Sequence, residues 1–140
     1  MAGTLNERFG AAFVSGGKLE DGNPACDMWI LNLEMMVSFV EQPDETTFEN
    51  IWERKDVTEQ ELFCRWGHSA AFVNTRYMLV FGGVNFDRKV VRDAFVFDML
   101  EFYLVPMEDR GEPPSVRLMN ASLLPAGNGV LTLYGGEDAN

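Results

Sequence analysis

The chain has 140 residues, of which 46% are hydrophobic and 12% aromatic, a composition that indicates a folded domain and excludes a disordered chain. Its 22 acidic and 11 basic side chains give a formal net charge of −11, which excludes nucleic acid as the expected partner. No apolar run reaches the length of a membrane span, and no charged and then apolar leader opens the chain. We therefore expect no membrane association and a cytoplasmic location.

Two cysteines, Cys26 and Cys64, lie 38 residues apart, and His68 is the single histidine of the sequence. The absence of a Cys-x-x-Cys pair excludes the usual tetrahedral zinc spacings. In a cytoplasmic protein these cysteines are predicted to be reduced, buried thiols rather than a disulfide. We expect neither a metal nor another cofactor.

Acidic side chains are concentrated between Glu34 and Glu61, where Arg54 and Lys55 are the only bases. This Glu34–Glu61 stretch, with an insertion at 34–50, is predicted to form an exposed, solvated loop, and the alternative is an acidic docking surface. Residues 29–40 come closest to a helical pattern, but their apolar positions are nearly continuous and define no polar face. No helix is therefore expected.

Short apolar runs with the lengths of β-strands recur between Gly, Asn, Asp and Pro turn signals, and they predict an all-β chain. The runs are Ala11–Val14, Met28–Leu33, Ser69–Val73, Tyr77–Phe81, Ala94–Phe97, Phe102–Val105, Ala121–Leu124 and Val130–Tyr134. We expect residues 65–83 to form an antiparallel hairpin that turns at residues 74–76, with Ala94–Asp98 as the neighbouring strand.

A set of landmarks repeats along these strands. A Gly-Gly pair ends a strand three times, and in the first two copies an aspartate lies ten residues after the pair. The aspartate opens a segment that contains an aromatic residue, a further aromatic follows, and an arginine comes thirteen or fourteen residues later. These landmarks are Gly16, Gly17, Asp27, Trp29, Trp52, Arg65, Gly67, His68, Gly82, Gly83, Asp93, Phe95, Tyr103, Arg117, Gly135 and Gly136.

Each landmark has a physical role in a repeated fold. Glycine adopts positive φ and lets a neighbouring backbone approach closely, so the pair suits a strand that ends in a crowded bend. The aspartate can accept hydrogen bonds from backbone amides, and the aromatic ring fills the space between stacked sheets. A buried arginine needs carbonyl or carboxylate partners, so Arg65 and Arg117 are predicted to fix one repeat to the next.

The order Gly-Gly, spaced Asp, aromatic-x-aromatic, lone aromatic and Arg-x-Gly-His-Ser resembles the kelch repeat of β-propellers, most fully in residues 65–83. The resemblance covers nearly the whole chain outside the insertion and implies four-stranded antiparallel blades, with the lone aromatic on the outer fourth strand. It places a partial blade at 1–64 with the acidic insertion at 34–50, a complete blade with its linker at 65–116, and the first two strands of another at 117–140. One full blade and parts of two others are therefore expected.

The last copy departs from the pattern, because Asn120 stands where His68 stands in the second copy and Leu118 and Met119 replace its Trp-Gly pair. In the first copy, Arg8 and Gly16 are only eight residues apart, which leaves room for one strand rather than a hairpin.

Propellers close with at least about four blades of roughly 50 residues, so this chain is too short to close alone. Trp29, Trp52 and Phe95 are therefore expected to be only partly covered. The missing cover would come from a protein partner or from further blades of the same or another chain, so an oligomer or a complex is expected.

No convergent catalytic set is recognisable, and His68 is expected to be a structural core residue. The loop between Gly83 and Asp93 combines three bases with an aromatic residue, and the resemblance places it on a face that binds partners. An ordinary solvated loop is the alternative. The candidate contacts are Phe86, Arg88, Lys89 and Arg92.

The expected function is that of a non-enzymatic module for protein interaction or assembly within a larger complex. The alternative is a fragment of a kelch-propeller enzyme with a central active site, for which sugars are the candidate substrate class.

Overall fold

The computed structural model describes residues 2–6, 10–43, 51–57, 60–105 and 117–138, with the backbone alone for residues 2–6 and 60. Arg8, residues 44–50 of the predicted acidic loop and the linker at the end of the second repeat lie outside these residues.

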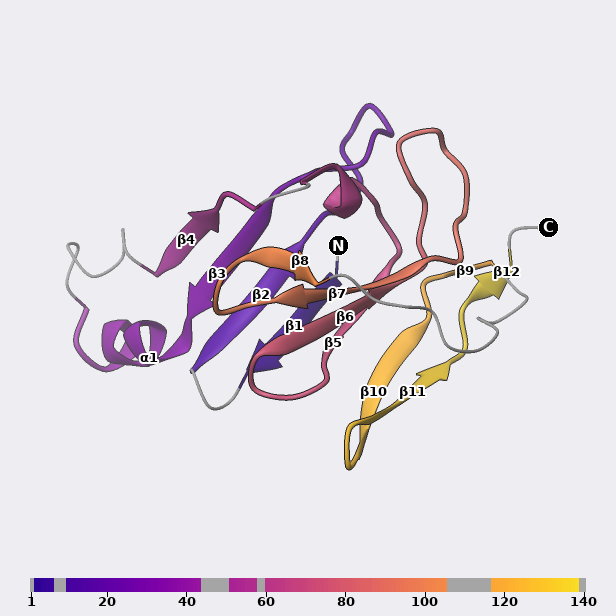
Figure 1. Ribbon diagram of the computed structural model, residues 1–140. Helices are drawn as coiled ribbons and strands as arrows, with labels where there is room; N and C mark the ends of the chain where they lie inside the picture. Colours follow the sequence, from indigo (N-terminus) through magenta and orange to yellow (C-terminus); the bar gives the residue numbers. More distant parts are fainter. Residues whose placement is uncertain (1, 7–9, 44–50, 58–59, 106–116, 139–140) are drawn as a thin grey trace.

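Two four-stranded antiparallel sheets, each with its strands in chain order, make up most of the fold (Figure 1). The first contains β1 (Ala2–Asn6), β2 (Ala11–Ser15), β3 (Met28–Asn32) and β4 (Trp52–Lys55). The second contains β5 (Ser69–Phe72), β6 (Tyr77–Phe81), β7 (Ala94–Asp98) and β8 (Tyr103–Val105). Two shorter sheets follow, one of β10 (Ser122–Gly127) and β11 (Val130–Tyr134), the other of β9 (Leu118–Met119) and β12 (Glu137–Asp138). The helix α1 (Leu33–Glu41) follows β3, and the 3-10 helix η2 (Gln60–Phe63) precedes β5.

The predicted all-β class is confirmed, and so is the hairpin expected in residues 65–83. β5 and β6 pair antiparallel, with Phe72 opposite Met78, and β7 pairs with the other edge of β6. Asn74 shapes the turn between β5 and β6, because its side-chain oxygen accepts hydrogen bonds from the amides of Arg76 at 2.8 Å and Tyr77 at 2.9 Å.

The expectation of one strand before Gly16 is wrong, because β1 and β2 form a complete antiparallel hairpin. The count from Arg8 to Gly16 misses the added strand, since β1 ends at Asn6, on the other side of that arginine. The first sheet therefore has four strands rather than a partial set.

The expectation of no helix is also wrong, because the segment predicted as a loop begins with α1. The side-chain oxygen of Asn32 accepts a hydrogen bond from the Met35 amide at 2.9 Å and caps the helix. Met36, Val37 and Val40 remain exposed, so the helix has no buried apolar face that a periodic pattern would reveal. Local signals for this helix in the sequence are the Asn32 N-cap and the acidic Glu34 in its first turn.

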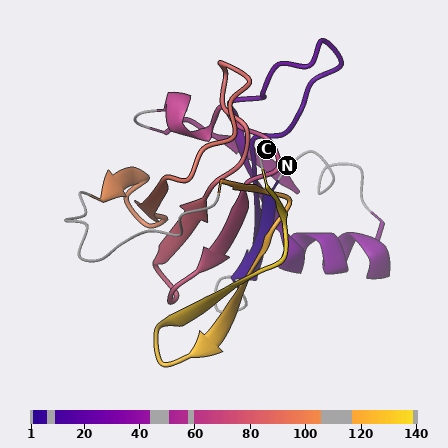
Figure 2. The same cartoon turned by 90° about the vertical axis from the view of Figure 1, so that its right-hand side faces the viewer.

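The strands β1 and β5, which begin the two four-stranded sheets, and β10, which begins the β10–β11 sheet, lie side by side (Figure 1). The β10–β11 sheet is called the third sheet below. The sheets diverge from this line of strands, as the rotated view shows (Figure 2).

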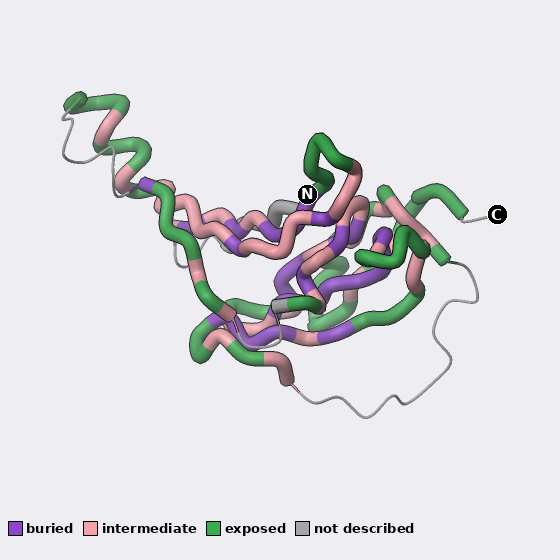
Figure 3. Tube along the Cα trace, turned by 90° about the horizontal axis from the view of Figure 1, so that it is seen from above, coloured by how far each residue is buried: buried purple, intermediate pink, exposed green. Residues whose placement is uncertain are grey.

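Aromatic side chains fill the space between the first two sheets. Phe13 and Phe72 meet edge to face with ring centroids 5.3 Å apart. Phe63, from η2, packs edge to face on Phe95 at 5.5 Å and on Phe97 at 5.0 Å. Buried segments follow these sheets, whereas α1 at their edge is half-buried to exposed (Figure 3). The core thus fixes the angle between two consecutive sheets.

The three aromatic landmarks expected to be partly covered differ in burial. Trp52 is 49% exposed and Trp29 is half-buried, as predicted, but Phe95 is only 8% exposed. The prediction failed for Phe95 because it did not include Phe63, which closes over that ring.

The described acids of the Glu34–Glu61 region lie at the surface, as expected. They are Glu34, Glu41, Glu53, Asp56 and Glu61.

Candidate functional site

The first Gly-Gly pair joins the first sheet to the segment that enters the second. The Gly16 amide donates to the Asp27 carbonyl and the Gly17 amide to the Arg65 carbonyl, each at 3.0 Å. Gly16 has φ +61°, and a Cβ there would lie 2.3 Å from the Arg65 carbonyl oxygen. Only glycine fits this close backbone approach, which confirms the role expected of the pair.

The second pair repeats this junction. Gly82 donates to Asp93 and Gly83 to Leu118, again at 3.0 Å, and a Cβ at Gly82 would lie 2.5 Å from the Leu118 carbonyl oxygen. Leu118 therefore takes the place of Arg65, and the predicted equivalence of Arg117 with Arg65 is wrong by one residue.

The strand register gives the same correction. Ser69 lies opposite Phe81 in the second sheet, and Ser122 lies opposite Tyr134 in the third. Counting back from these serines, Asn120 matches Gly67 rather than His68, and both adopt positive φ, +57° and +64°. The sequence comparison failed because it aligned the copies on arginine, whereas 17 residues separate Arg65 from Gly82 and also Leu118 from Gly135.

The third pair has a different environment. Gly136 is crowded, since a Cβ there would lie 2.9 Å from the Ala121 Cβ. Gly135 has φ +70°, like Gly16 and Gly82, yet a Cβ on it would meet no described heavy atom within 4 Å. The third repeat thus has the backbone conformation of the junction without a neighbouring described segment.

Arg65 is 4% exposed, and its guanidinium has carbonyl and carboxylate partners, as predicted. Nε donates to the Leu62 carbonyl at 2.7 Å, and Nη1 donates to the Gly82 carbonyl at 2.9 Å. The guanidinium also forms a two-point ion pair with Asp93, at 2.8 and 3.2 Å. The Arg65 side chain therefore joins the end of β6 to the start of β7, while the Arg65 carbonyl accepts the hydrogen bond from Gly17 in the first repeat.

His68 is buried between the first two sheets. Its Nε2 lies 3.1 Å from the Ser15 Oγ, and both side chains are nearly inaccessible. Burial lowers the pKa of His68 to about 3, and the nearby charge of Arg65 acts in the same direction. The imidazole is therefore neutral near pH 7.

The expectation of reduced thiols is wrong, because Cys26 and Cys64 form a disulfide. The Gly17–Arg65 backbone bond draws the two segments together, and the Ala25 amide donates to the Gly17 carbonyl at 2.8 Å. These contacts bring the two Cα atoms to 4.1 Å, a proximity that their separation of 38 residues does not reveal.

The loops β2–β3 and β6–β7 have the same backbone design and lie at the same end of the sheets (Figure 1). In the first loop Leu19 donates to the Asn23 carbonyl, and in the second Asn85 donates to the Lys89 carbonyl. Gly22 in the first loop matches Arg88 in the second, and both adopt positive φ, +85° and +59°. The second loop therefore has a charged side chain where the first has glycine.

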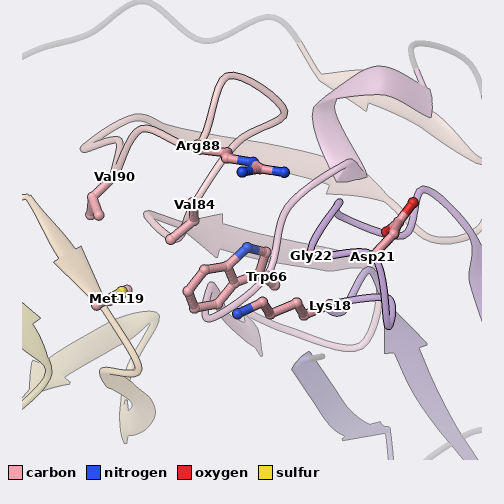
Figure 4. Close-up of a pocket in the computed structure, with 8 residues that line it drawn as sticks. All are labelled: Lys18, Asp21, Gly22, Trp66, Val84, Arg88, Val90 and Met119. Carbon is pink, nitrogen blue, oxygen red and sulfur yellow. The ribbon is translucent and has the colours of Figure 1, made fainter.

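An open hollow of about 350 Å³ lies between these loops (Figure 4). Trp66 occupies its centre, and Val84, Val90 and Met119 extend the apolar lining. The polar part comes from Lys18, Asp21 and Arg88, with Gly22 beside them. All three repeats contribute to this hollow.

The charged rim of the hollow has defined positions. The Lys18 Nζ lies 4.8 Å from the centroid of the Trp66 ring. In Figure 4, the Arg88 guanidinium lies on the other side of that ring and is directed toward Asp21 and Gly22. Hydrogen bonds from Asn23 to both oxygens of Asp21 lower the pKa of this carboxyl, with a smaller contribution from Arg88.

The four predicted contact residues are exposed but do not share one surface. Arg88 lines the hollow around Trp66, whereas Lys89 and Arg92 line a second hollow of about 310 Å³ together with Arg117. Phe86 is exposed and lines neither. Sequence reasoning missed Lys18 and Trp66 as site residues, because only the packing of consecutive repeats brings them beside Arg88.

The two landmark aspartates accept hydrogen bonds from side chains, Asp27 from Trp29 and Asp93 from Arg65, where backbone amides were expected as donors. Trp29 donates from Nε1 to the Asp27 carboxylate at 2.7 Å. Trp52 and Tyr103 begin β4 and β8, the fourth strands of the two complete sheets.

Within the described ranges, no group of three or more His, Cys, Asp and Glu side chains could hold a metal ion. No helix in this part of the chain has the length and apolarity needed to cross a bilayer.

The geometry defines an all-β fold of consecutive antiparallel sheets, and the comparison with solved structures finds 70 chains that match it. One of them, titled "Structure of YjhT", superposes with a TM-score of 0.61 at 13% sequence identity. The match covers 99% of this chain and 38% of that chain, so the present chain spans well under half of its length. At this identity the likeness concerns the fold alone. No family model and no curated protein matches the sequence.

Proposed function

We propose that the chain is a segment of a kelch-type β-propeller and serves as a non-enzymatic module for protein interaction and assembly. The support is the exact repetition of junction bonds, with Gly16 and Gly17 in the first sheet and Gly82 and Gly83 in the second. The side-by-side first strands also agree with blades arranged around an axis.

Gly135 is the observation that carries the assembly proposal. At the two equivalent glycines, a carbonyl oxygen of the following repeat occupies the space of a side chain. It lies 2.3 Å from the position that a Cβ on Gly16 would take, and 2.5 Å from that of a Cβ on Gly82. Gly135 has the same φ but no described neighbour there. We infer that a carbonyl from a further repeat, in the same or another chain, fits against it in the assembled protein.

The third sheet supports the same proposal. Leu124, Val130 and Tyr134 are exposed, with Tyr134 at 74%, and among the described strands β11 pairs with β10 alone. Exposed apolar side chains beside an unpaired strand edge favour association, because burial removes apolar surface from water and pairing satisfies the edge.

Two glycine variants test the proposal by sedimentation velocity at micromolar concentration. Gly135→Ala places a methyl group where the carbonyl of the next repeat would lie, so it is expected to reduce association. Gly129→Ala is the matched control, since Gly129 also has positive φ, +72°, and no described atom within 4 Å of a Cβ, but it lies in the β10–β11 turn. Association of the unmodified chain that Gly135→Ala leaves unchanged, or that Gly129→Ala reduces equally, would contradict the role given to Gly135.

A further inference from the structure

The hollow around Trp66 lies where three repeats meet. None of its lining residues belongs to the assembly contact proposed at Gly135. We propose that this hollow binds an acidic peptide segment that carries an aromatic or large apolar side chain. The inference rests on the proposed function as a protein-interaction module and names the chemistry of its partner.

The charge of the rim is the first reason. Lys18 and Arg88 contribute two cations, and the one carboxylate, Asp21, has each of its oxygens bonded to Asn23. Neither cation has a carboxylate within ion-pair distance among the described residues. In a chain with a net charge of −11, this rim of two cations and one carboxylate is locally positive and attracts a negatively charged group from a partner.

The apolar lining is the second reason. Trp66 is half-buried, and Val84 beside it is held by two backbone hydrogen bonds to Trp66, at 2.8 and 3.1 Å. An apolar or aromatic side chain placed against this lining would lose its contact with water while adjacent carboxylates reach Lys18 and Arg88. Aromatic and arginine residues are the types that most often dominate binding energy at interfaces.

The conformation of Arg88 is the third reason. Arg88 adopts φ +59°, a region that suits the glycine found at the matching position, Gly22. A large side chain at this φ costs local stability, and a binding role for Arg88 would offset that cost.

Exposed apolar residues on the same two loops favour a peptide over a small molecule. Leu19 follows Lys18 in the first loop, and Phe86 precedes Arg88 in the second, and both are more than half exposed. An extended segment lying across the hollow would contact both loops, which a small anion confined to the hollow would not.

The test uses fluorescence anisotropy with a labelled peptide of sequence Glu-Glu-Phe-Glu-Glu and the full chain. We expect saturable binding that weakens with added salt, and little binding of Lys-Lys-Phe-Lys-Lys or Glu-Glu-Ser-Glu-Glu. Arg88→Gly relieves the backbone conformation and should retain or raise the melting temperature, while peptide binding weakens about tenfold or more. Lys89→Glu, in the same loop but on the second hollow, is the control and should reduce binding far less.

Three results would overturn the inference. They are unchanged binding by Arg88→Gly, an equal loss in Lys89→Glu, which would indicate diffuse attraction to the loop, and binding of phenylacetate as tight as that of the peptide, which would indicate a small-molecule site. Sedimentation of Arg88→Gly should match the unmodified chain, so a failure here is distinguishable from a failure of assembly through Gly135.

Discussion

At the scale of single residues, Arg65 shows how a repeat landmark acts in the folded chain. Its guanidinium is bonded to two carbonyls and to Asp93, and its own carbonyl accepts from Gly17. The sequence predicted these partner types because a buried arginine requires them. It could not predict that Arg117, with matching spacing, is exposed and takes no part in the equivalent junction.

Replacing Arg65 with alanine is expected to lower the free energy of unfolding by about 2 kcal/mol, because it removes the buried donor to the Leu62 and Gly82 carbonyls, whereas the half-exposed Asp93 carboxylate regains contact with water. Arg117→Ala is the matched control and should change stability by no more than about 0.5 kcal/mol. Urea denaturation of both variants measures the difference. Similar losses would restore the equivalence of the two arginines and contradict the register derived from Ser69 and Ser122.

His68 predicts a dependence of stability on pH. Its pKa is about 3 in the folded protein and near 6.5 when exposed, so the unfolded chain binds a proton first as the pH falls. Stability from this residue is complete above about pH 6.5 and is lost between there and pH 3, by up to about 1.4 kcal/mol per pH unit.

Urea denaturation at pH 7, 6, 5 and 4 tests this prediction, with His68→Gln as the comparison. The variant lacks the titrating group and should lose stability less steeply on acidification. Parallel slopes for the two proteins would show that His68 does not titrate differently on folding.

At the scale of elements, most strands could be predicted from the sequence, whereas β1 and α1 could not. Strand-length apolar runs and the Gly-Gly pairs predict β2, β3, β5, β6, β7 and β11 closely, because alternation and turn chemistry are local. Asn32 and Asp98 occupy matching strand ends, opposite Ala11 and Tyr77, and both side chains cap the turn that follows. In the first repeat that cap starts α1, and in the second it closes a tight turn.

The hollow and the disulfide could not be predicted from the sequence in the same way. Lys18, Trp66 and Arg88 come from three separated segments, which the Gly17–Arg65 and Trp66–Val84 backbone hydrogen bonds bring together. The chemistry of each side chain was visible, whereas their proximity depends on tertiary contacts.

The Cys26–Cys64 disulfide predicts a redox-dependent stability. It closes a loop over 38 residues, and the chain-entropy estimate for a loop of this length is about 4 kcal/mol of stabilisation. The melting temperature should fall on addition of dithiothreitol in the unmodified chain and stay constant in a Cys26→Ser, Cys64→Ser double variant. Titratable free thiols in the native protein, with no effect of the reductant, would contradict the disulfide.

At the scale of the whole molecule, the two complete sheets and the third, exposed sheet differ in how well each is covered. The first two bury Phe63, Phe97, Met28 and Met78 almost completely, but β10 and β11 carry large apolar side chains at the surface. The proposed kelch-type assembly accounts for this difference, because each blade is covered by the blade that follows it.

The central claim is that this chain does not persist alone as a stable monomer. Light scattering at micromolar concentration, followed by thermal unfolding of the same sample, tests it most directly. We predict a particle heavier than 15.8 kDa, or a broad, non-cooperative transition if the required partner is another protein. A particle of 15.8 kDa with a sharp, cooperative transition would contradict the assembly proposal.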